Sequence, residues 1–364
     1  MAVNLRNRFW FVVLSCICRF IFAATFIVSG FLKSMDPWGT ILAMESYLAA
    51  YNLAAPEWLV EVGAIALGAA ELILGCMLLF NAYIRITTVV SMVVMLFFTI
   101  LTLLSATIIP VEDCGCFGDF IKLTPWQTFA KNAVLLPMTI CFWYHYRKEQ
   151  PFESWKRDFI LMLVFSAGAI GLGVYSYFHL PIFDNTPYKK GVNIAEEITI
   201  HTNAKPAEEE VVLVYRNRET DELHEFSVDD TTWQNDSLWV WVETRVNDAN
   251  IEAPILLEFY VSDSEGDKTK ELLAKSKLYM LFMDSSECEP EVKAAFAKVE
   301  QYVDTNGGEV VYITPEELST LELTRPCYNM DPKTMKTILR AEYGLVILEN
   351  GVITDKFNYR DIPY

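Results

Sequence analysis

The sequence predicts an α-helical membrane bundle followed by an α/β outer domain that carries an added β-rich segment. The first observation is a set of five apolar stretches, each near the ~20 residues that span a bilayer, at roughly 10–33, 59–80, 86–109, 128–145 and 159–180. The second is that the net charge of −18 lies entirely in residues 181–364. The third is that strand-like and helix-like segments alternate after residue 250, as in an α/β fold.

The charge of the second half excludes one class of partner. Residues 181–364 contain 18 basic and 36 acidic side chains, whereas residues 1–180 contain 11 of each. Binding to nucleic acid depends on clustered Lys and Arg, so we expect no nucleic-acid partner. An acidic surface also repels anionic headgroups, so contact with the lipid bilayer is expected from the apolar stretches alone.

The first apolar stretch is interpreted as a span that is retained in the mature protein. It follows Arg6 and Arg8, as the core of a signal peptide would. Its apolar run is longer than the roughly 7–15 residues of such a core, and no convincing cleavage site of small residues follows it.

Basic residues in the connecting segments alternate along the chain and set the expected orientation. They lie at the N-terminus, between spans two and three, and between spans four and five: Arg6, Arg8, Arg85, Arg147, Lys148, Lys156 and Arg157. These places belong in the cytoplasm, which makes 34–58 and 110–127 outer loops. Five spans then put the C-terminal domain outside. In a bacterium this describes a multi-pass inner-membrane protein with a periplasmic C-terminal domain.

Two ionisable residues, Arg19 and Glu71, fall inside predicted spans. Each is costly in hydrocarbon, so each should face the bundle interior and find a partner. One interpretation is a substrate or quinone pocket, or a proton path. The other is a structural ion pair, with Arg19 extending toward one membrane face. Several small residues suit close helix contacts, namely Gly63, Ala64, Gly68, Gly75, Gly168, Gly171 and Gly173.

Cys114-Gly115-Cys116 lies in the second outer loop, where disulfides persist. A disulfide between residues i and i+2 is near the limit of disulfide geometry, and such strain makes the bond more oxidising. This favours a redox dithiol, although a structural disulfide or turn remains open. A metal site is the third alternative, with help from Asp113, Asp119 and His179. The cysteines inside spans, namely Cys16, Cys18, Cys76 and Cys141, are interpreted as apolar core thiols.

The order of these signals resembles the DoxX-like membrane proteins, and specifically their MauE (methylamine utilisation) branch. The residues that carry the resemblance are Arg19, Ser29-Gly30, Lys33, Glu71 with Gly75, and the "CGCFGD" loop. It covers about residues 10–147. It implies a four-helix DoxX-like core, to which the sequence adds a fifth span. It also implies a role in disulfide formation or maturation of an exported client protein.

The outer half is expected to begin with an extended polar connector over 181–210. Strands follow at 211–217, 223–230 and 237–246, the first two flanking a turn. After residue 250 we expect a strand, a turn at Gly266, a short helix, a buried strand at 278–283, an amphipathic helix at about 290–304, another buried strand and a further helix. A hairpin that turns at Asn350-Gly351 ends this order.

That order resembles the thioredoxin-like fold of the TlpA and peroxiredoxin group, over about 250–364. The resemblance implies a reactive cysteine at Cys288, where a helix N-terminus lowers the thiol pKa. Two features of the family are missing. Glu291 replaces the second cysteine of the Cys-x-x-Cys motif, and the family's cis-proline, which should lie near Tyr343-Gly344, is absent. Three alternatives follow for Cys288. It forms a disulfide with Cys327, or it exchanges with the loop cysteines, or it belongs to a binding module that has lost thiol–disulfide exchange.

The sequence is thus divided into four parts: a four-helix transmembrane domain (1–147), a fifth transmembrane helix with connector (148–184), a β-rich outer segment (185–250) and a thioredoxin-like domain (251–364). The leading hypothesis is a thiol–disulfide redox or maturation protein for exported clients. Its site residues are Cys114, Cys116 and Cys288, with Arg19 and Glu71 lining a pocket for a possible quinone. A non-enzymatic, membrane-anchored assembly protein is the alternative, and a transporter or respiratory-subunit role is the third.

Overall fold

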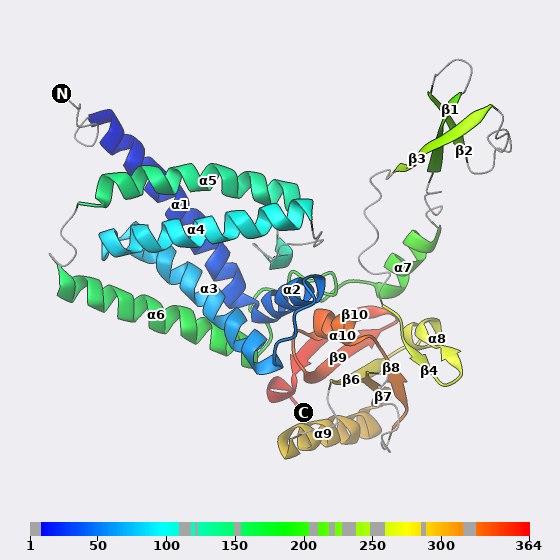
Figure 1. Ribbon diagram of the computed structural model, residues 1–364. Coiled ribbons are helices and arrows are strands. Elements are labelled where there is room, and N and C mark those ends of the chain that lie inside the picture. The colour runs from blue at the N-terminus through cyan, green and yellow to red at the C-terminus, as the bar shows by residue number, and fades with distance from the viewer. Residues whose placement is uncertain are drawn as a thin grey trace, which may run out of the picture.

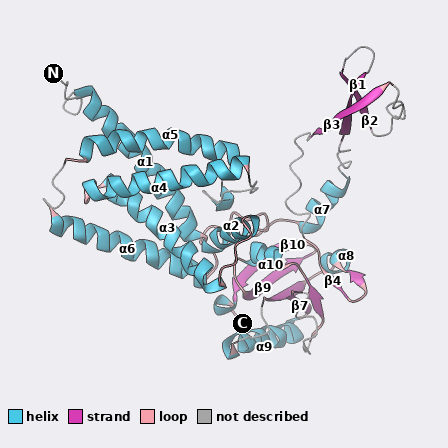
Figure 2. Ribbon diagram, viewed as in Figure 1, coloured by secondary structure: helices cyan, strands magenta, loops and turns pink. Residues whose placement is uncertain are grey.

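The computed structural model describes residues 9–108, 118–120, 123–148, 154–203, 210–217, 223–227, 238–247, 259–284, 289–315 and 325–364. A helical N-terminal region is followed by a region of mixed sheet (Figures 1 and 2). The helical region contains α1 (Phe9–Met35), α2 (Pro37–Ala50), α3 (Glu57–Leu79), α4 (Ile84–Thr107), α5 (Pro125–Tyr146) and α6 (Trp155–Phe178).

Four of these helices, α1, α3, α4 and α6, are long and apolar enough to cross a membrane, judged by length and composition. They confirm four of the five expected spans. The remaining expected span, 128–145, forms α5, which is not among the helices that meet this criterion in the described residues. Polar residues such as Lys131 and Asn132 lower its apolar character. The helix nevertheless packs along α1 and α4 as part of the bundle.

The basic connecting segments gather at one end of the bundle. The Arg157 guanidinium donates to the Asn81 carbonyl over 3.3 Å, and the Tyr83 amide donates to the Asp158 carboxylate over 2.8 Å. The turn between α3 and α4 therefore lies against the start of α6. The ring of Phe11, near the start of α1, also packs on Tyr144 at the end of α5. This grouping matches the alternation expected from the charges.

Segment 34–58 was expected to be an outer loop between the first two spans, and most of it is helical in the structure. The segment contains α2, which begins where the Asp36 side chain accepts a hydrogen bond from the Gly39 amide. Pro37 occupies the first helical position, where its missing N–H costs nothing. The helix packs on α3 at the end of the bundle opposite the basic segments.

The C-terminal region is built on a seven-stranded sheet of order β10-β9-β6-β7-β8-β4-β5. Its central strand β6 (Leu278–Met283) runs parallel to β7 (Glu309–Thr314) and antiparallel to β9 (Tyr343–Glu349). The other strands are β4 (Ser262–Asp263), β5 (Gly266–Asp267), β8 (Cys327–Asn329) and β10 (Val352–Asn358). The hairpin between β9 and β10 turns at Asn350 and Gly351, both with positive φ, as the sequence predicted.

Helices cover both faces of this sheet. On one face α9 (Pro290–Asn306) buries Val292 and Phe296 against the alternate residues Tyr279 and Leu281 of β6. On the other face α10 (Pro332–Leu339) and α8 (Thr269–Leu273) pack on the alternate residues of β6 that include Met280. Every residue of β6 is buried, which explains its unbroken apolar sequence.

The prediction of an extended connector over 181–210 was wrong for part of that segment. Residues 194–203 form α7 (Ile194–Asn203), whose first turn is capped by the Asn193 side chain accepting from the Glu196 amide. The chain before α7 bonds to β10, where the Gly191 amide donates to the Ile353 carbonyl over 2.7 Å. Tyr188 and Ile194 supply the apolar surface that draws this segment into the sheet core.

The β-rich segment confirms the three expected strands. β1 (Glu210–Asn217) lies between β2 (Leu223–Ser227) and β3 (Trp239–Asn247) in an antiparallel sheet of its own. In sequence it is inserted between α7 and β4. In Figure 1 it stands apart from the larger sheet. Its described side chains include an aromatic contact between Phe226 and Trp239, with ring centroids 4.9 Å apart.

Candidate functional site

A buried ionic cluster joins α1 and α3 inside the bundle. Lys33 donates to both oxygens of the Glu71 carboxylate, each over 2.7 Å. Ser29, one turn before Lys33, donates to the same carboxylate over 2.7 Å and accepts from Lys33 over 3.1 Å. The two charged side chains are only 6% and 7% exposed. Each charge is therefore paired and hydrogen-bonded, which is the condition for burying it.

Glycines let the two helices approach closely enough to form this cluster. A Cβ atom on Gly30 would lie 2.2 Å from the backbone nitrogen of Leu72. A Cβ atom on Gly75 would lie 2.8 Å from the backbone nitrogen of Ile27. Such contacts leave no room for a side chain, so these glycines set the spacing of α1 and α3. The expectation that small residues serve close helix contacts is confirmed at Gly75. It is wrong at Gly168 and Gly171, where a Cβ atom would meet nothing within 4 Å.

The ionic cluster lies in the wall of a cavity of about 490 Å³. The wall is mostly apolar and is built by α1, α2, α3, α4 and α5. Besides Ser29, Lys33 and Glu71, its polar members include Lys131 and Asn132 of α5. The Asn132 amide donates to the Thr102 hydroxyl over 3.2 Å, which ties α5 to α4. An apolar cavity with a few converging polar groups is the usual form of a small-molecule site.

Arg19 lies outside this cavity and away from Glu71. Its guanidinium donates to the Asn81 side chain and lies 5.3 Å from the Tyr146 ring centroid. Lys33 is fourteen residues further along α1, which is ~21 Å at 1.5 Å per residue. The two ionisable residues expected to share a pocket therefore belong to opposite ends of the bundle. The partner of Glu71 is Lys33 instead of Arg19. The sequence pattern that could have indicated it is Ser29-x-x-x-Lys33, whose i, i+4 spacing puts both residues on one helix face.

Cys114, Cys116 and Cys288 lie outside the described residues, as does Asp113. The segment that carries Cys114 and Cys116 joins α4 to α5, and the halves of those helices nearest to it line the cavity at Leu101 and Lys131. A short 3₁₀ helix, η2 (Gly118–Phe120), follows the two cysteines and packs near α2.

His179, considered as a metal ligand beside the loop cysteines, has a different partner. Its Nδ1 lies 2.8 Å from the Asp361 carboxylate, and its ring stacks on Tyr175. Asp361 belongs to η6 (Tyr359–Asp361), after the last strand. The contact therefore ties the end of α6 to the sheet region.

The described residues on either side of Cys288 mark one edge of the sheet. Asp284 directly follows β6, and Glu289 directly precedes α9. Cys327 lies in β8, with its Sγ 3.2 Å from the Thr314 hydroxyl at the end of β7. Burial raises the pKa of the Cys327 thiol, although the Thr314 contact opposes this shift. Cys327 is a free thiol.

The sheet region is fastened to the bundle by buried cations of α10 and the turn after it. Lys336 lies 3.3 Å from Glu57, 3.4 Å from Asp284 and 3.8 Å from Glu45. Arg340, which is 3% exposed, lies 3.2 Å from Asp36. This interface was not predicted from the sequence. Its residues are scattered along the chain, and no short motif connects them.

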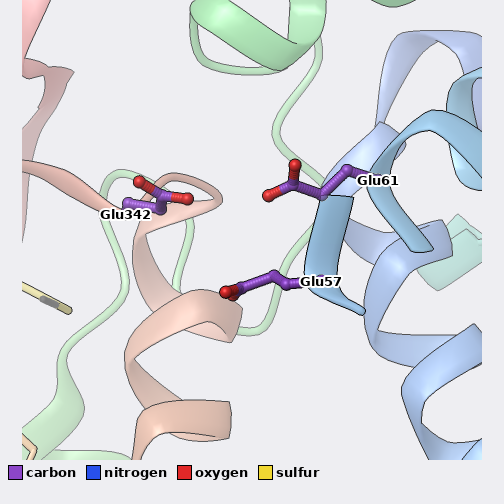
Figure 3. A group of neighbouring side chains, drawn as sticks. All are labelled: Glu57, Glu61 and Glu342. Atoms are coloured by element: carbon purple, nitrogen blue, oxygen red, sulfur yellow. The ribbon is translucent and has the colours of Figure 1, made fainter. Parts of the chain in front are cut away.

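Acidic side chains are crowded at the same interface (Figure 3). Carboxylate oxygens of Glu57, Glu61 and Glu342 lie within 4.8 Å of one another. Glu57 and Glu61 extend from α3, whereas Glu342 precedes β9. Burial and the two neighbouring glutamates raise the pKa of Glu342 to about 7.

These features define a multi-pass membrane protein with a mixed-sheet domain docked on one end of its bundle. Residues 11–145 match the family model described as methylamine utilisation protein MauE. The expected resemblance to MauE over about 10–147 is thereby confirmed, and the matched part contains the whole cavity. A search of curated proteins and a search of solved structures each found no match.

Proposed function

We propose that this protein is a bacterial inner-membrane thiol–disulfide redox protein that matures exported clients. Cys114 and Cys116 form its outer dithiol, and the cavity below them receives a membrane quinone. The observation that carries the proposal is the position of the cavity. Its wall includes the parts of α4 and α5 nearest the Cys-Gly-Cys segment, together with the Lys33–Glu71 pair.

The chemistry balances in two exchanges. The loop disulfide accepts two electrons from a client dithiol, so the client gains a disulfide and the loop becomes a dithiol. The loop dithiol then gives two electrons and two protons to the quinone, and the disulfide is restored. Lys33 and Ser29 supply N–H and O–H donors in the cavity wall, and the Glu71 carboxylate accepts hydrogen bonds from both. The apolar remainder of the wall suits a hydrophobic ring.

The sheet region is inferred to be a thioredoxin-like domain. Support comes from the strand order β10-β9-β6-β7, with β6 parallel to β7 and the β9–β10 hairpin antiparallel beside them. α9 follows β6, so Cys288 precedes a helix N-terminus, where a thiolate is favoured. Cys288 would exchange with the loop cysteines or with Cys327.

The orientation belongs to the same proposal. The basic segments share one end of the bundle, which would face the cytoplasm. The docked sheet region and the Cys-Gly-Cys segment would then face the periplasm, where a disulfide persists. The crossing is completed by α5, whose polar residues face the cavity instead of lipid.

One observation favours a second candidate, a membrane-anchored assembly protein without redox activity. Glu291 stands where the resolving cysteine of an active thioredoxin-like domain would be, and Glu289 adds a second negative charge. Like charges disfavour the thiolate of Cys288. In this candidate the sheet region only holds the client.

The deciding experiment uses the full chain in lipid nanodiscs with a soluble quinone analogue and a dithiol-bearing reductant. Quinone reduction is followed by absorbance, and the thiols are trapped by maleimide and read by mass spectrometry. We expect turnover in the wild type and at least ~100-fold loss in C114S and in C116S, because neither variant can form the loop disulfide. C76S, which changes a cysteine inside α3, is the matched control and should retain turnover.

Two outcomes would contradict the proposal. One is turnover in C114S equal to that of C76S. The other is a Cys114–Cys116 pair that keeps one oxidation state whatever the ratio of quinone to quinol. In the second case, retention of a client by a variant lacking Cys114, Cys116, Cys288 and Cys327 would establish the assembly protein.

A further inference from the structure

The bundle covers the edge of the sheet where β6 ends and β9 begins. A cavity of about 280 Å³ lies between the two regions, lined by Trp38 and Tyr177 of the bundle and by Glu289 and Tyr343 of the sheet region. The Trp38 and Tyr177 rings stack on each other, 5.3 Å between centroids. The surface beside Glu289 therefore faces aromatic side chains of the bundle instead of open solvent.

Two buried cations fasten this contact from the sheet side. Lys336 reaches Glu57 of α3 and Glu45 of α2, and Arg340 reaches Asp36 at the start of α2. Both cations have partners on the other region, so separation of the two regions would break every one of these ion pairs. A buried charge that loses its partner must return to water, which makes these contacts decisive for docking.

The carboxylates at the interface outnumber the cation that faces them. Glu342 opposes Glu57 and Glu61, and among the described residues Lys336 is the cation that lowers the pKa of Glu342. The ionisable groups that act on Glu342 or share its surroundings come from α2, α3, α6, the end of β6, α10 and η6: Glu45, Glu57, Glu61, Tyr177, Asp284, Lys336, Tyr359 and Arg360. Burial also raises the pKa of Glu45 and of Asp284.

We propose that this interface is a reversible latch: Lys336 and Arg340 hold the sheet region on the bundle, and release uncovers the sheet edge beside Glu289. The occupant of that edge in the latched state is the bundle itself, through Trp38 and Tyr177. Release is favoured when Glu342 loses its proton, because three carboxylates then repel one another across the interface. The latch does not depend on the redox proposal, because the experiment that tests it measures docking of the two regions and not thiol chemistry.

The direction of the pH effect follows from linkage. In the docked state the pKa of Glu342 is about 7, above its ordinary value of 4.5. Between pH 4.5 and pH 7, docking is therefore coupled to the uptake of a proton by Glu342. The contribution of Glu342 to docking is fully present below pH 4.5 and weakens by up to about tenfold per pH unit as the pH rises toward 7. Above that pH the dependence on Glu342 levels off.

Hydrogen–deuterium exchange of the full chain in nanodiscs measures docking directly. Exchange of α2 and α10 is compared at pH 5 and pH 8 between the wild type and E342Q, each pair at the same pH so that the intrinsic exchange rates cancel. We expect equal protection at pH 5. At pH 8 we expect the wild type to exchange at least ~10-fold faster than E342Q.

Two further variants make the test specific. E349Q removes an exposed carboxylate at the far end of β9, where Glu349 pairs with Lys277, and should behave like the wild type. K336M should increase exchange of α2 and α10 at both pH values, since Glu57, Glu45 and Asp284 lose their shared cation. If K336M fails to fold, the comparison of E342Q with E349Q still decides whether Glu342 controls the pH dependence of docking.

The latch is overturned if the wild type and E342Q show the same protection of α2 and α10 at both pH values. It is also overturned if E349Q reproduces the effect of E342Q, because the dependence would then belong to the net charge of the sheet region.

Discussion

Lys33 and Glu71 form a buried ion pair between α1 and α3, with the Lys33 Nζ 2.7 Å from each carboxylate oxygen. Gly30 and Gly75 let α1 and α3 approach closely beside this pair. The backbone spacing and the ion pair therefore depend on each other. Four experiments test this relationship and the packing around the sheet region.

Removing one partner of the pair should cost more than removing both. K33M or E71Q leaves a polar group unpaired in the bundle interior, and we expect each to lower the free energy of unfolding by ~3–5 kcal/mol. The double variant K33M/E71Q should recover most of that loss. Thermal unfolding in nanodiscs, analysed as a double-mutant cycle, measures the coupling. Additive losses in the double variant would show that the two side chains do not interact.

A methyl group at Gly30 should force α1 and α3 apart. The new Cβ would meet the Leu72 backbone at 2.2 Å, so G30A should destabilise the bundle by ~1–3 kcal/mol. Gly168 is a matched control, because a Cβ there meets nothing within 4 Å. G168A should be neutral or slightly stabilising, as Ala is the better helix former. Equal effects of the two variants on the unfolding temperature would refute this assignment.

The Asp184–Lys356 pair should make the stability of the sheet region fall in acid. Burial raises the pKa of Asp184, but the Lys356 ammonium 2.5 Å away and the Thr186 hydrogen bonds outweigh it, so the pKa is lowered. A carboxyl with a lowered pKa contributes stability above its ordinary range and loses it as pH falls through the lowered value. D184N should be less stable at pH 7 and should differ less from the wild type as pH falls below about 4.

The control for that experiment is D355N, which removes a carboxylate from the exposed pair of Asp355 with Lys190. Exposed pairs contribute at most ~1 kcal/mol, so this variant should follow the wild type at every pH. A D184N curve that runs parallel to the wild-type curve from pH 7 to pH 3 would contradict the prediction.

Cys327 should alkylate slowly in the folded protein. Burial raises the pKa of its thiol, which keeps the thiolate fraction small at pH 7. We expect iodoacetamide to modify it at least ~10-fold more slowly than free cysteine at the same pH. Peptide mass spectrometry over time measures the rate. A rate equal to that of free cysteine would show an accessible and unperturbed thiol.

The sequence predicted the parts of the fold whose pattern is local. The buried strand β6 could be recognised as an unbroken apolar run of strand length, and the amphipathic helix α9 because its apolar residues follow the period of a helix. The Asn350-Gly351 turn was found because few dipeptides favour positive φ at both positions. Helices α2 and α7 were missed, since their neighbours resemble loops and their apolar residues pack on distant elements.

The site was only half predictable for the same reason. Glu71 was recognised because a carboxylate in an apolar helix is conspicuous. Its partner Lys33 lies near the end of the first span, where a basic residue is expected to face the membrane surface. The interface residues Lys336, Arg340 and Glu342 gave no signal, since their partners Asp36, Glu57 and Glu61 lie far away in the sequence.

The backbone bonds between the segment before α7 and strand β10 also govern the order in which the chain is assembled. Tyr188 and Ile194 leave the ribosome long before the strand that completes their surroundings. The Gly191 amide must wait for the Ile353 carbonyl, and the three-stranded insertion is synthesised in between. The larger sheet therefore closes only at a late stage of synthesis, whereas the inserted sheet has all its strands available earlier.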